Sequence, residues 1–478
     1  MNESANIQGQ GQDNRAVERS AMFVATLTSF MGPFLISSVN VALPAIQKEL
    51  GLNAVQLSWI ATAYLLAVAV GLVPAGKVAD IHGRKKIFAT GLGVYVIGAG
   101  LSVFAWSAFT LIFSRVVQGL GAAMFVTTGM AIITSIFPPQ KRGRVIGWYV
   151  AAVYVGLSVG PFVGGVLTQY LGWRSIFIVT LPMGVGSLLL TLYVLKGEWR
   201  GEPGQQLDLV GCFLYTASIL SLVYGASRLP DGIGIVLTPL GFLLLAVFVM
   251  HQKRARFPVF EVKLFAENKR FAFSSFAALL NYSATFSVTF LLSLYLQYIK
   301  GMTPQAAGTI LMAQPVVMAL FSPAAGRLAD RIEPRYLATA GMAITVLGVF
   351  LFRMLDSHST VSVIVANLIL LGFGFALFST PNMSAIMGAV EKRYYGQASG
   401  VVATMRLLGQ MASMAVAMVV LTLLVGRQQI EPANYNRFLD AIHLVFTISA
   451  LSCLIGVYFS WFRGGEKVSV TGQDSSPP

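Results

Sequence analysis

Fourteen long apolar runs, nearly free of charged residues, constrain this chain more than any other feature of its sequence. A bilayer core about 30 Å thick is crossed by roughly 20 apolar residues in a helix. Helices are favoured because backbone polar groups in lipid must be bonded within their own segment. We therefore predict an all-α polytopic membrane protein with fourteen transmembrane helices. The runs lie at about 21–46, 56–77, 87–106, 109–136, 144–170, 175–195, 209–227, 233–251, 271–297, 304–328, 336–355, 360–386, 396–425 and 438–461.

The composition excludes a water-soluble globular protein. Of 478 residues, 56% are hydrophobic and only 11% are charged, whereas soluble domains carry about 25% charged residues. The polar stretch at 1–20 lacks the basic region and short apolar core of a signal peptide, so we expect the first apolar run to remain in the mature protein.

The positive charges are distributed unevenly between the predicted loops. An even number of spans puts both chain ends on one side of the membrane. That side holds 24 of the 33 lysines and arginines, the other side holds seven, and only Arg115 and Arg406 lie within spans. Basic residues accumulate on the cytoplasmic side of membrane proteins. We therefore expect a multi-pass protein of the cell membrane with both termini in the cytoplasm, and the net charge of +14 does not indicate nucleic-acid binding.

No residue pattern indicates a metal or a cofactor. Cys212 and Cys453 both lie in apolar runs without the spacing of metal ligands, and the four histidines are scattered along the chain. We expect the cysteines to be buried apolar residues. No cofactor and no metal site is predicted.

A short motif occurs twice and divides the chain. The segments "PAGKVAD" (74–80) and "PAAGRLAD" (323–330) end the second and tenth predicted spans. If two additional helices separate two bundles of six, both motifs follow the second helix of a bundle. Such paired bundles are a transporter architecture, with the substrate bound near the membrane midplane between them. The predicted parts are a cytoplasmic tail at 1–20, an N-terminal six-helix bundle at 21–197, a two-helix insert at 206–252, a C-terminal six-helix bundle at 269–464 and a cytoplasmic tail at 465–478.

Several ordered motifs resemble one transporter family. The stretch "GKVADIHGRK" (76–85) is similar to motif A of the major facilitator superfamily, except that Ile81 replaces the usual first arginine. The sequence also resembles the fourteen-helix drug:proton antiporter branch of that family in "RVVQGLGAA" (115–123), "GLSVGPFVGG" (156–165), "GWRSIF" (172–177) and "TMRLLGQ" (404–410). The resemblance implies a multidrug-efflux-like exporter of small amphipathic molecules that works by alternating access, and not an enzyme.

The dense charge between the second and third spans has two interpretations. The Asp80 carboxylate is expected to pair with cations of its own loop or with the positive N-terminus of a helix in the other bundle. The resemblance implies that such contacts latch the cytoplasmic side shut; the alternative is a plain topology anchor. The candidate latch residues are Gly76, Asp80, Gly83, Arg84 and Lys85 in the first repeat and Asp330 and Arg331 in the second.

The fifth span carries a stripe of small residues. Gly156, Gly160 and Gly164 recur every four residues and suit close helix packing. Pro161 removes a backbone donor and is expected to kink the helix, and Gly165 completes the motif. The resemblance links this pattern to exporters; the alternative is generic helix packing.

Two arginines are expected to face the interior of the bundles. Placing an arginine at the centre of a transmembrane helix costs about 2.5–3.5 kcal/mol on insertion scales, so it needs a partner. Arg115 has Gln118 one turn away, and Arg406 has Gln410 at the i+4 position. Each arginine is interpreted as a cavity or proton-handling residue, or alternatively as a structural one.

The first span departs from the family pattern. Asn40 and the residues after it match the antiporter motif, but Leu35 occupies the position of the family's acidic residue, and no carboxylate lies at the centre of any predicted span. A cationic substrate or a proton carrier in low dielectric would favour such a group. Two functions therefore remain open: an exporter, with protons as a possible partner, or an uncoupled facilitator or lipid flippase. The neutral polar residues left for substrate are Ser37, Ser38, Asn40, Asn281, Tyr282, Gln314 and Asn367.

Overall fold

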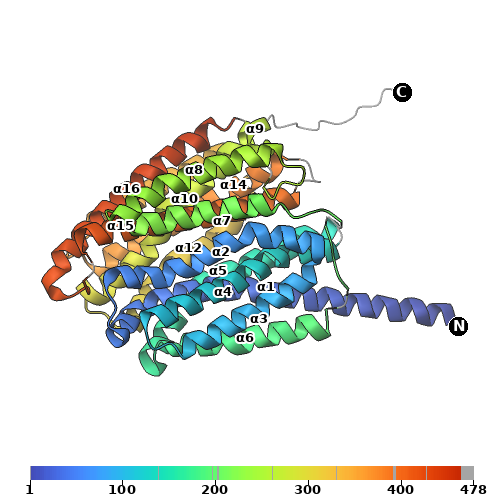
Figure 1. Cartoon of the computed structure of the whole chain (residues 1–478), viewed down its shortest axis with the longest axis horizontal. Coiled ribbons are helices and arrows are strands. Elements are labelled where there is room, and N and C mark those ends of the chain that lie inside the picture. Colours follow the sequence, from blue (N-terminus) through green and yellow to red (C-terminus); the bar gives the residue numbers. More distant parts are fainter. Residues whose placement is uncertain are drawn as a thin grey trace.

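The structure is a computed structural model of the whole chain, and it is all helical in the residues that it describes (Figure 1). The backbone is described for 2–137, 139–195, 197–201, 204–260, 262–329, 331–390, 395–426 and 428–464. Within these helices, the side chains of 2–17, 139–144, 146, 263–264, 395–397 and 399 are not described.

Fourteen helices in the described residues are long and apolar enough to cross a membrane. The predicted number of spans and the predicted fold class are therefore confirmed. The helices of the described residues are α1 (Asn2–Leu50), α2 (Ala54–His82), α3 (Arg84–Val103), α4 (Ala108–Ile136), α5 (Pro139–Leu171), α6 (Arg174–Tyr193), α7 (Leu209–Ser227), α8 (Gly232–Arg254), α9 (Lys263–Glu267), α10 (Lys269–Leu294), α11 (Pro304–Leu311), α12 (Ala313–Ala329), α13 (Pro334–Phe352), α14 (Val361–Gly388), α15 (Tyr395–Leu424) and α16 (Tyr435–Phe462), with a π-helical turn η1 (Tyr295–Ile299) and a 3₁₀ turn η3 (Pro432–Asn434). Of these, α9 is too short to be a span, and α11 and α12 together form one span.

Polar residues at the ends of the apolar runs define where helices begin. Asn53 forms a capping box with Gln56 at the start of α2, and Ser107 forms one with Thr110 at the start of α4. Each cap satisfies backbone N–H groups that have no partner within the helix. Short polar connections of this kind turn the chain back into the bundle at each face.

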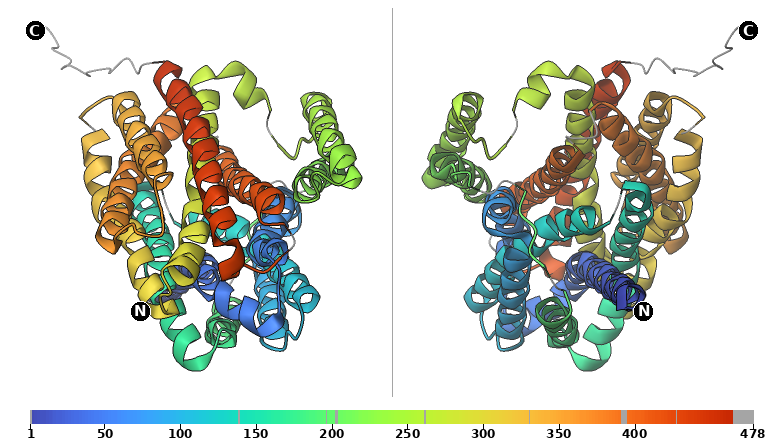
Figure 2. Two further views of the ribbon diagram at one scale, coloured as in Figure 1. Left: turned by 90° about the vertical axis from the view of Figure 1, so that its left-hand side faces the viewer. Right: turned by 90° about the vertical axis from the view of Figure 1, so that its right-hand side faces the viewer.

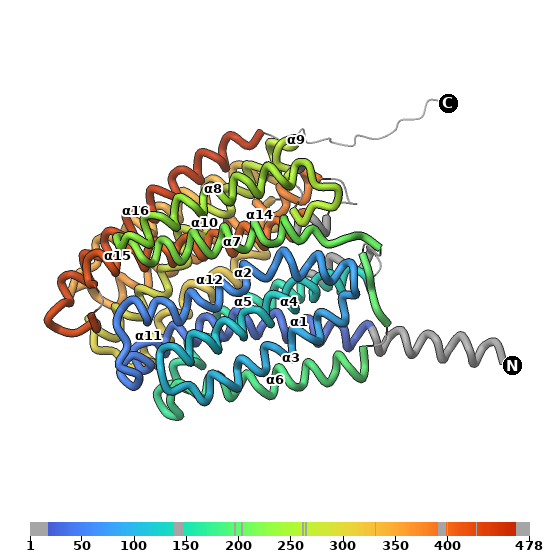
Figure 3. The backbone as a smooth tube through the Cα atoms, in the orientation of Figure 1, coloured from blue at the N-terminus to red at the C-terminus, as the bar shows by residue number. Residues whose placement is uncertain are grey.

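The helices form two groups that pack against each other, which we call the N-terminal half (α1–α6) and the C-terminal half (α10–α16). Figure 2 shows α7 and α8, in green, at the outer edge of the molecule, where α7 packs on α2 and α15. Figure 3 shows the helices running back and forth between two faces, with the connections between them at those faces. We call the face where α16 ends and α2 meets α3 the termini face, and the other one the opposite face.

Three spans differ in detail from the prediction. The helix that was expected to start near residue 21 begins at Asn2, in a stretch without proline. The span expected at 304–328 is divided at Met312 into α11 and α12. The ninth span ends in the π turn η1 rather than as a regular helix. Such turns are frequent at functional sites, and both irregular helices contact the N-terminal half.

A partly buried polar cluster at the termini face joins the two insert helices to each other. The Asp208 carboxylate caps α7 by accepting from the Gly211 N–H at 2.8 Å. It also contacts His251 Nε2 at 2.9 Å and accepts from Gln252 Nε2 at 2.8 Å, both on α8. Burial alone would raise the pKa of Asp208, but these hydrogen bonds outweigh it and hold the pKa below its ordinary value. The carboxylate therefore joins the two insert helices in its charged form.

Candidate functional site

The charged turn between α2 and α3 closes on itself. Arg84 Nη2 lies 2.7 Å from Asp80 Oδ1, and the same guanidinium donates to Ser135 Oγ of α4 at 2.6 Å. Gly83 joins the two helices with φ +129°, a backbone conformation that favours glycine. A Cβ on Gly76 would lie 2.8 Å from Thr127 Cγ2, so this glycine permits close packing of α2 on α4.

The linker after α6 completes this turn, and no sequence motif predicted that contact. The Glu198 carboxylate accepts from the backbone N–H groups of Lys85 and Lys86 at 2.8 and 3.2 Å, which caps the start of α3. The Arg84 N–H donates to the Trp199 carbonyl, and the Gly201 N–H donates to the Asp80 carbonyl. A carboxylate at a helix N-terminus is stabilised by the helix dipole.

The contacts found for Asp80 in the described residues all come from the N-terminal half or its linker. The structure thus brings Gly76, Asp80, Gly83, Arg84 and Lys85 together but does not join them to the second repeat. Arg331 is exposed in the turn after α12, and Asp330 lies outside the described residues. The gating role of all seven residues stays a prediction.

At the opposite face, hydrogen bonds cross the seam between the halves. Ser293 Oγ donates to the Asn40 carbonyl at 2.8 Å, and Gln297 Nε2 donates to the Val41 carbonyl at 2.9 Å. Tyr298 Oη donates to Gln47 Oε1. Gln297 and Tyr298 belong to the π turn η1, which therefore joins the halves at this face.

The glycine motif of α5 packs in two directions. Gly156 and Gly164 face α1, where added Cβ atoms would lie 2.6 Å from the Phe30 carbonyl oxygen and from Ser38 Cα. Gly165 instead faces the C-terminal half, with its Cβ position 2.5 Å from the Pro304 carbonyl oxygen of α11. Gly160 packs against α1 beside Ser37, and the Pro161 carbonyl contacts Gly308 of α11. Part of the motif thus packs within one half and part lies at the seam.

Arg115 is enclosed within the N-terminal half. Its side chain is 1% exposed, donates to Gln118 Oε1 at 2.6 Å and lies 4.4 Å above the centre of the Tyr64 ring. Nε lies 3.4 Å from the Ile60 carbonyl oxygen, and Phe177 covers the other side. These partners are neutral, so the cation is held by an amide, a carbonyl and aromatic faces.

Arg406 lies between the two halves. Its guanidinium is within electrostatic interaction range of Tyr149 on α5 and Tyr282 on α10. Tyr154 of α5 lies near Tyr282 as well, and its hydroxyl is 3.5 Å from Ser379 Oγ of α14. We call these five residues the tyrosine–arginine cluster. Sequence reasoning identified Arg406 and Tyr282 but missed the other three, because tyrosine and serine are common in helix packing.

The remaining candidates sit at different depths in the molecule. Asn40 is 2% exposed, and its Oδ1 has no hydrogen-bond partner in the described residues. Leu35 is fully buried on the same helix. Gln410 lies one turn beyond Arg406 on α15 and is half-buried. Within the described part of the chain, no group of three or more metal-ligating side chains is assembled.

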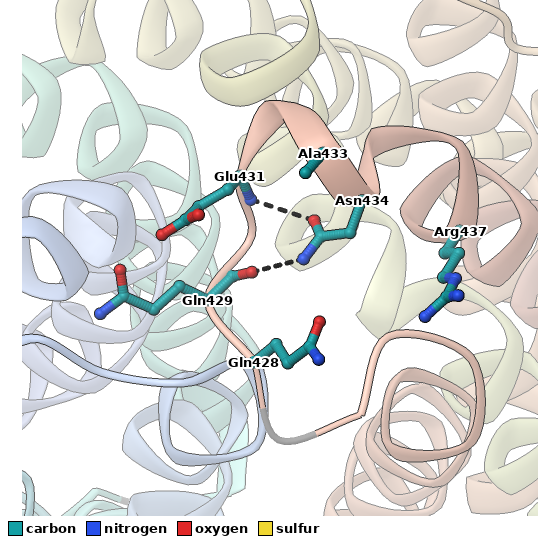
Figure 4. Close-up of a pocket in the computed structure, with 6 residues that line it drawn as sticks. All are labelled: Gln428, Gln429, Glu431, Ala433, Asn434 and Arg437. Carbon is teal, nitrogen blue, oxygen red and sulfur yellow. Dashed lines mark hydrogen bonds between the residues drawn. The ribbon is translucent and has the colours of Figure 1, made fainter.

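A polar pocket of about 430 Å³ opens at the opposite face, in the loop that follows α15 (Figure 4). In that loop, the Glu431 N–H donates to Asn434 Oδ1 at 3.0 Å, and Asn434 Nδ2 donates to the Gln429 carbonyl at 2.6 Å. The neighbouring Gln428 carbonyl accepts from the Ala54 N–H of the N-terminal half at 2.9 Å. The pocket therefore lies beside the closed seam and away from the tyrosine–arginine cluster.

The family model described as Major Facilitator Superfamily matches residues 22–252 and 274–477. The chain belongs to the major facilitator superfamily. The resemblance inferred from the motifs is thereby confirmed, and this major facilitator chain is a multi-pass membrane transporter with fourteen candidate spans.

Curated relatives of this major facilitator transporter have several names. It is 28% identical to the riboflavin transporter RibZ of Clostridioides difficile (strain 630), over 92% of this chain and 96% of the relative. It is 32% identical to the multidrug resistance protein Stp of Mycobacterium tuberculosis (strain CDC 1551 / Oshkosh), over 79% and 71%. It is 31% identical to the cephamycin export protein CmcT of Amycolatopsis lactamdurans, over 87% and 88%.

Solved structures share the fold of this major facilitator chain. A POT family transporter in complex with a thioalcohol-conjugated peptide superposes with a TM-score of 0.71 at 14% identity, over 92% of this chain and 96% of that one. A bacterial homolog of the human lysosomal transporter Spinster gives 0.65 at 15% identity, over 94% and 97%.

Proposed function

We propose that this transporter exports small amphipathic aromatic molecules that are neutral or anionic, by alternating access across the cell membrane. The carrying observation is the tyrosine–arginine cluster, which gathers a cation and three aromatic hydroxyl side chains from both halves. Arginine stacks on aromatic rings and donates to carboxylates and carbonyls. Among the described residues, no carboxylate lies beside this cluster to attract an organic cation.

The names of two relatives, for multidrug resistance and cephamycin export, support export, and the name of the riboflavin transporter supports an aromatic substrate without giving a direction. The antiporter-like glycine motif on α5, with Gly165 at the seam, supports outward transport over uptake. We propose that the termini face is cytoplasmic, because basic residues concentrate in its loops.

The hydrogen bonds at the opposite face support a working cycle in which this structure is one state. Ser293, Gln297 and Tyr298 hold the seam closed there. In the proposed cycle the tyrosine–arginine cluster is reached from the termini face in this conformation. When the halves rock, the seam opens and substrate leaves toward the opposite face.

As a second part of the proposal, export is coupled to the movement of protons. Leu35 stands where the family carries its acid, and the Asp80 carboxylate at the termini face is the group proposed to take its place. The second candidate is an uncoupled facilitator or flippase with the same fold. It is favoured by the absence of a carboxylate at the centre of the spans in the described residues.

The test is transport into proteoliposomes under an imposed pH gradient. Riboflavin serves as the neutral aromatic probe and ethidium as the cationic one. We expect gradient-driven accumulation of riboflavin, weaker transport of ethidium, and loss of riboflavin transport in Arg406→Gln. Arg353→Gln, which changes an arginine at the opposite face, is the matched control. The proposed site would be overturned if riboflavin and ethidium were transported equally and if Arg406→Gln changed neither rate.

The same assay separates the two candidate functions. Accumulation that requires the gradient and falls in Asp80→Asn supports antiport with the coupling group displaced from the first span. Equilibration of riboflavin that is independent of the gradient supports the uncoupled facilitator. The site test with Arg406→Gln is independent of this result, because it measures rate and not driving force.

A further inference from the structure

An apolar groove separates the two-helix insert from the N-terminal half. Its volume is about 600 Å³, within the range of about 300–1,000 Å³ typical of ligand pockets. Helices α2, α4, α7 and α8 all contribute to it. The residues that define it are Trp59, Leu66, Ile112, Leu220, Tyr224 and Leu237.

The groove extends inward from the opposite face along α2 and α7. Its rim there is marked by the Trp59 and Tyr224 rings, 6.1 Å apart. Along α2 the lining runs from Trp59 to Leu66, about 10 Å at 1.5 Å per residue. The groove therefore fits within one leaflet of the roughly 30 Å hydrocarbon core. Beyond it, Tyr215 Oη donates to the Ala69 carbonyl at 2.9 Å and fastens α7 to α2.

A cation stands at the rim of the groove. The Arg228 guanidinium lies 5.8 Å from the centre of the Tyr224 ring, at the end of α7. Its Nη1 forms an ion pair with Asp231 Oδ2 at 3.8 Å, and its Nε has no hydrogen-bond partner in the described residues. Tryptophan, tyrosine and arginine at this depth are typical of the membrane–water interface. An arginine there suits a phosphate oxygen.

The groove does not result from loose packing of the insert. A Cβ on Gly225 would lie 2.7 Å from the Thr238 backbone nitrogen, and one on Gly241 would lie 2.7 Å from the Leu222 backbone nitrogen. Helices α7 and α8 therefore touch backbone to backbone beside the groove. The space lies between this tight pair and α2 with α4.

We propose that the groove binds one anionic phospholipid from the leaflet at the opposite face. An acyl chain lies along Leu66 and Leu220, and the phosphate contacts Arg228. The apolar lining, the aromatic side chains at the rim and the cation beside them together select this occupant over a soluble ligand. The inference depends only on the membrane location of the chain and not on the proposed substrate.

The test uses the purified full chain in nanodiscs of phosphatidylcholine with phosphatidylglycerol that carries a photoreactive acyl chain. Peptides crosslinked to the lipid are identified by mass spectrometry. We expect labelling of α7 around Leu220 and Tyr224, reduced about fivefold in Arg228→Gln because one interfacial cation is lost. The matched control is Arg353→Gln, since Arg353 also lies at the opposite face, 5.9 Å from a Phe350 ring.

A second variant fills the groove. Leu220→Trp is expected to abolish labelling while leaving the elution volume and helical circular dichroism unchanged. Equal labelling of all variants would overturn the proposal, because it would indicate unspecific lipid contact. Competition by riboflavin would overturn it in favour of a substrate site. A dimer by light scattering, lost in Leu220→Trp, would overturn it in favour of a second copy.

Discussion

The two ends of the seam between the halves use different chemistry. At the opposite face, uncharged groups make the contacts: Ser293 and Gln297 donate to carbonyls of α1, and Gly165 touches α11. At the termini face, the charged pair of Asp80 and Arg84 stays within the N-terminal half. Close neutral packing thus joins the two halves at the opposite face, whereas the Asp80–Arg84 pair at the termini face joins groups of one half.

The largest effect is expected from filling the close contact at the seam with Gly165→Val. Overpacking costs about 1–3 kcal/mol, and this cost falls mainly on the conformation closed at the opposite face. We expect its population relative to the open one to fall about 5- to 150-fold. The measurement is the distance between spin labels at Lys48 and His358, one in each half, with both native cysteines replaced by serine.

The control for this change lies on the same helix. Gly147 is exposed, and a Cβ there would meet no atom within 4 Å. Gly147→Val should leave the distance distribution unchanged. A distribution that Gly165→Val also leaves unchanged would mean that this glycine contact does not hold the seam closed.

A smaller shift in the same direction is expected from Gln297→Ala. The change removes a neutral hydrogen bond to the Val41 carbonyl, and such a bond contributes about 0.5–1.5 kcal/mol. The open conformation should gain about two- to tenfold in population, by the same spin-label distance. Gln305→Ala, at the exposed edge of the seam, should change it less. A larger shift in Gln305→Ala than in Gln297→Ala would mean that the main contact between the halves lies at the exposed edge of the seam.

The charged end should respond in the opposite sense. If Asp80 docks on a helix of the C-terminal half when the opposite face opens, that contact is worth about 0.3–1 kcal/mol. Asp80→Asn should then favour the conformation closed at the opposite face by about two- to fivefold. An unchanged distance distribution would identify the charged turn as a topology anchor alone. Asp356→Asn, in a loop of the opposite face, is the control.

The smallest effect concerns the contacts that join the two insert helices, and it is an effect on the free energy of unfolding. The pKa of Asp208 is lowered in the folded protein, so its contribution is present above the unfolded pKa of about 3.9 and is lost as pH falls through the folded pKa. Asp208→Asn should destabilise the protein by about 1 kcal/mol at pH 7, because asparagine can still cap α7 but the bonds to His251 and Gln252 lose their charge-assisted strength. The difference should vanish in strong acid. Thermal unfolding at both pH values measures it.

The comparison variant for the insert is Asp231→Asn. Asp231 occupies the same cap position on α8 but makes no side-chain cap bond. It should lower the melting temperature less than Asp208→Asn at pH 7. Equal losses would show that the His251 and Gln252 contacts add nothing to the cap.

The sequence predicted the number and order of the spans because apolar runs of membrane length have few alternative structures. It also predicted that Arg115 and Gln118 share a helix face, since residues three apart are neighbours on a helix. It could not predict that Glu198 caps α3 or that Tyr149 and Tyr154 approach Arg406. Those contacts join segments far apart in the chain, and no local pattern encodes them. The π turn at Tyr295–Ile299 was missed because its residues look like ordinary helix.

The position of α7 has a mechanical consequence. This helix packs on α2 of one half and on α15 of the other, and the Tyr215–Ala69 bond fastens it to α2. In the proposed rocking cycle, α7 would travel with α2 and slide along α15. The insert would then limit how far this edge of the molecule can open.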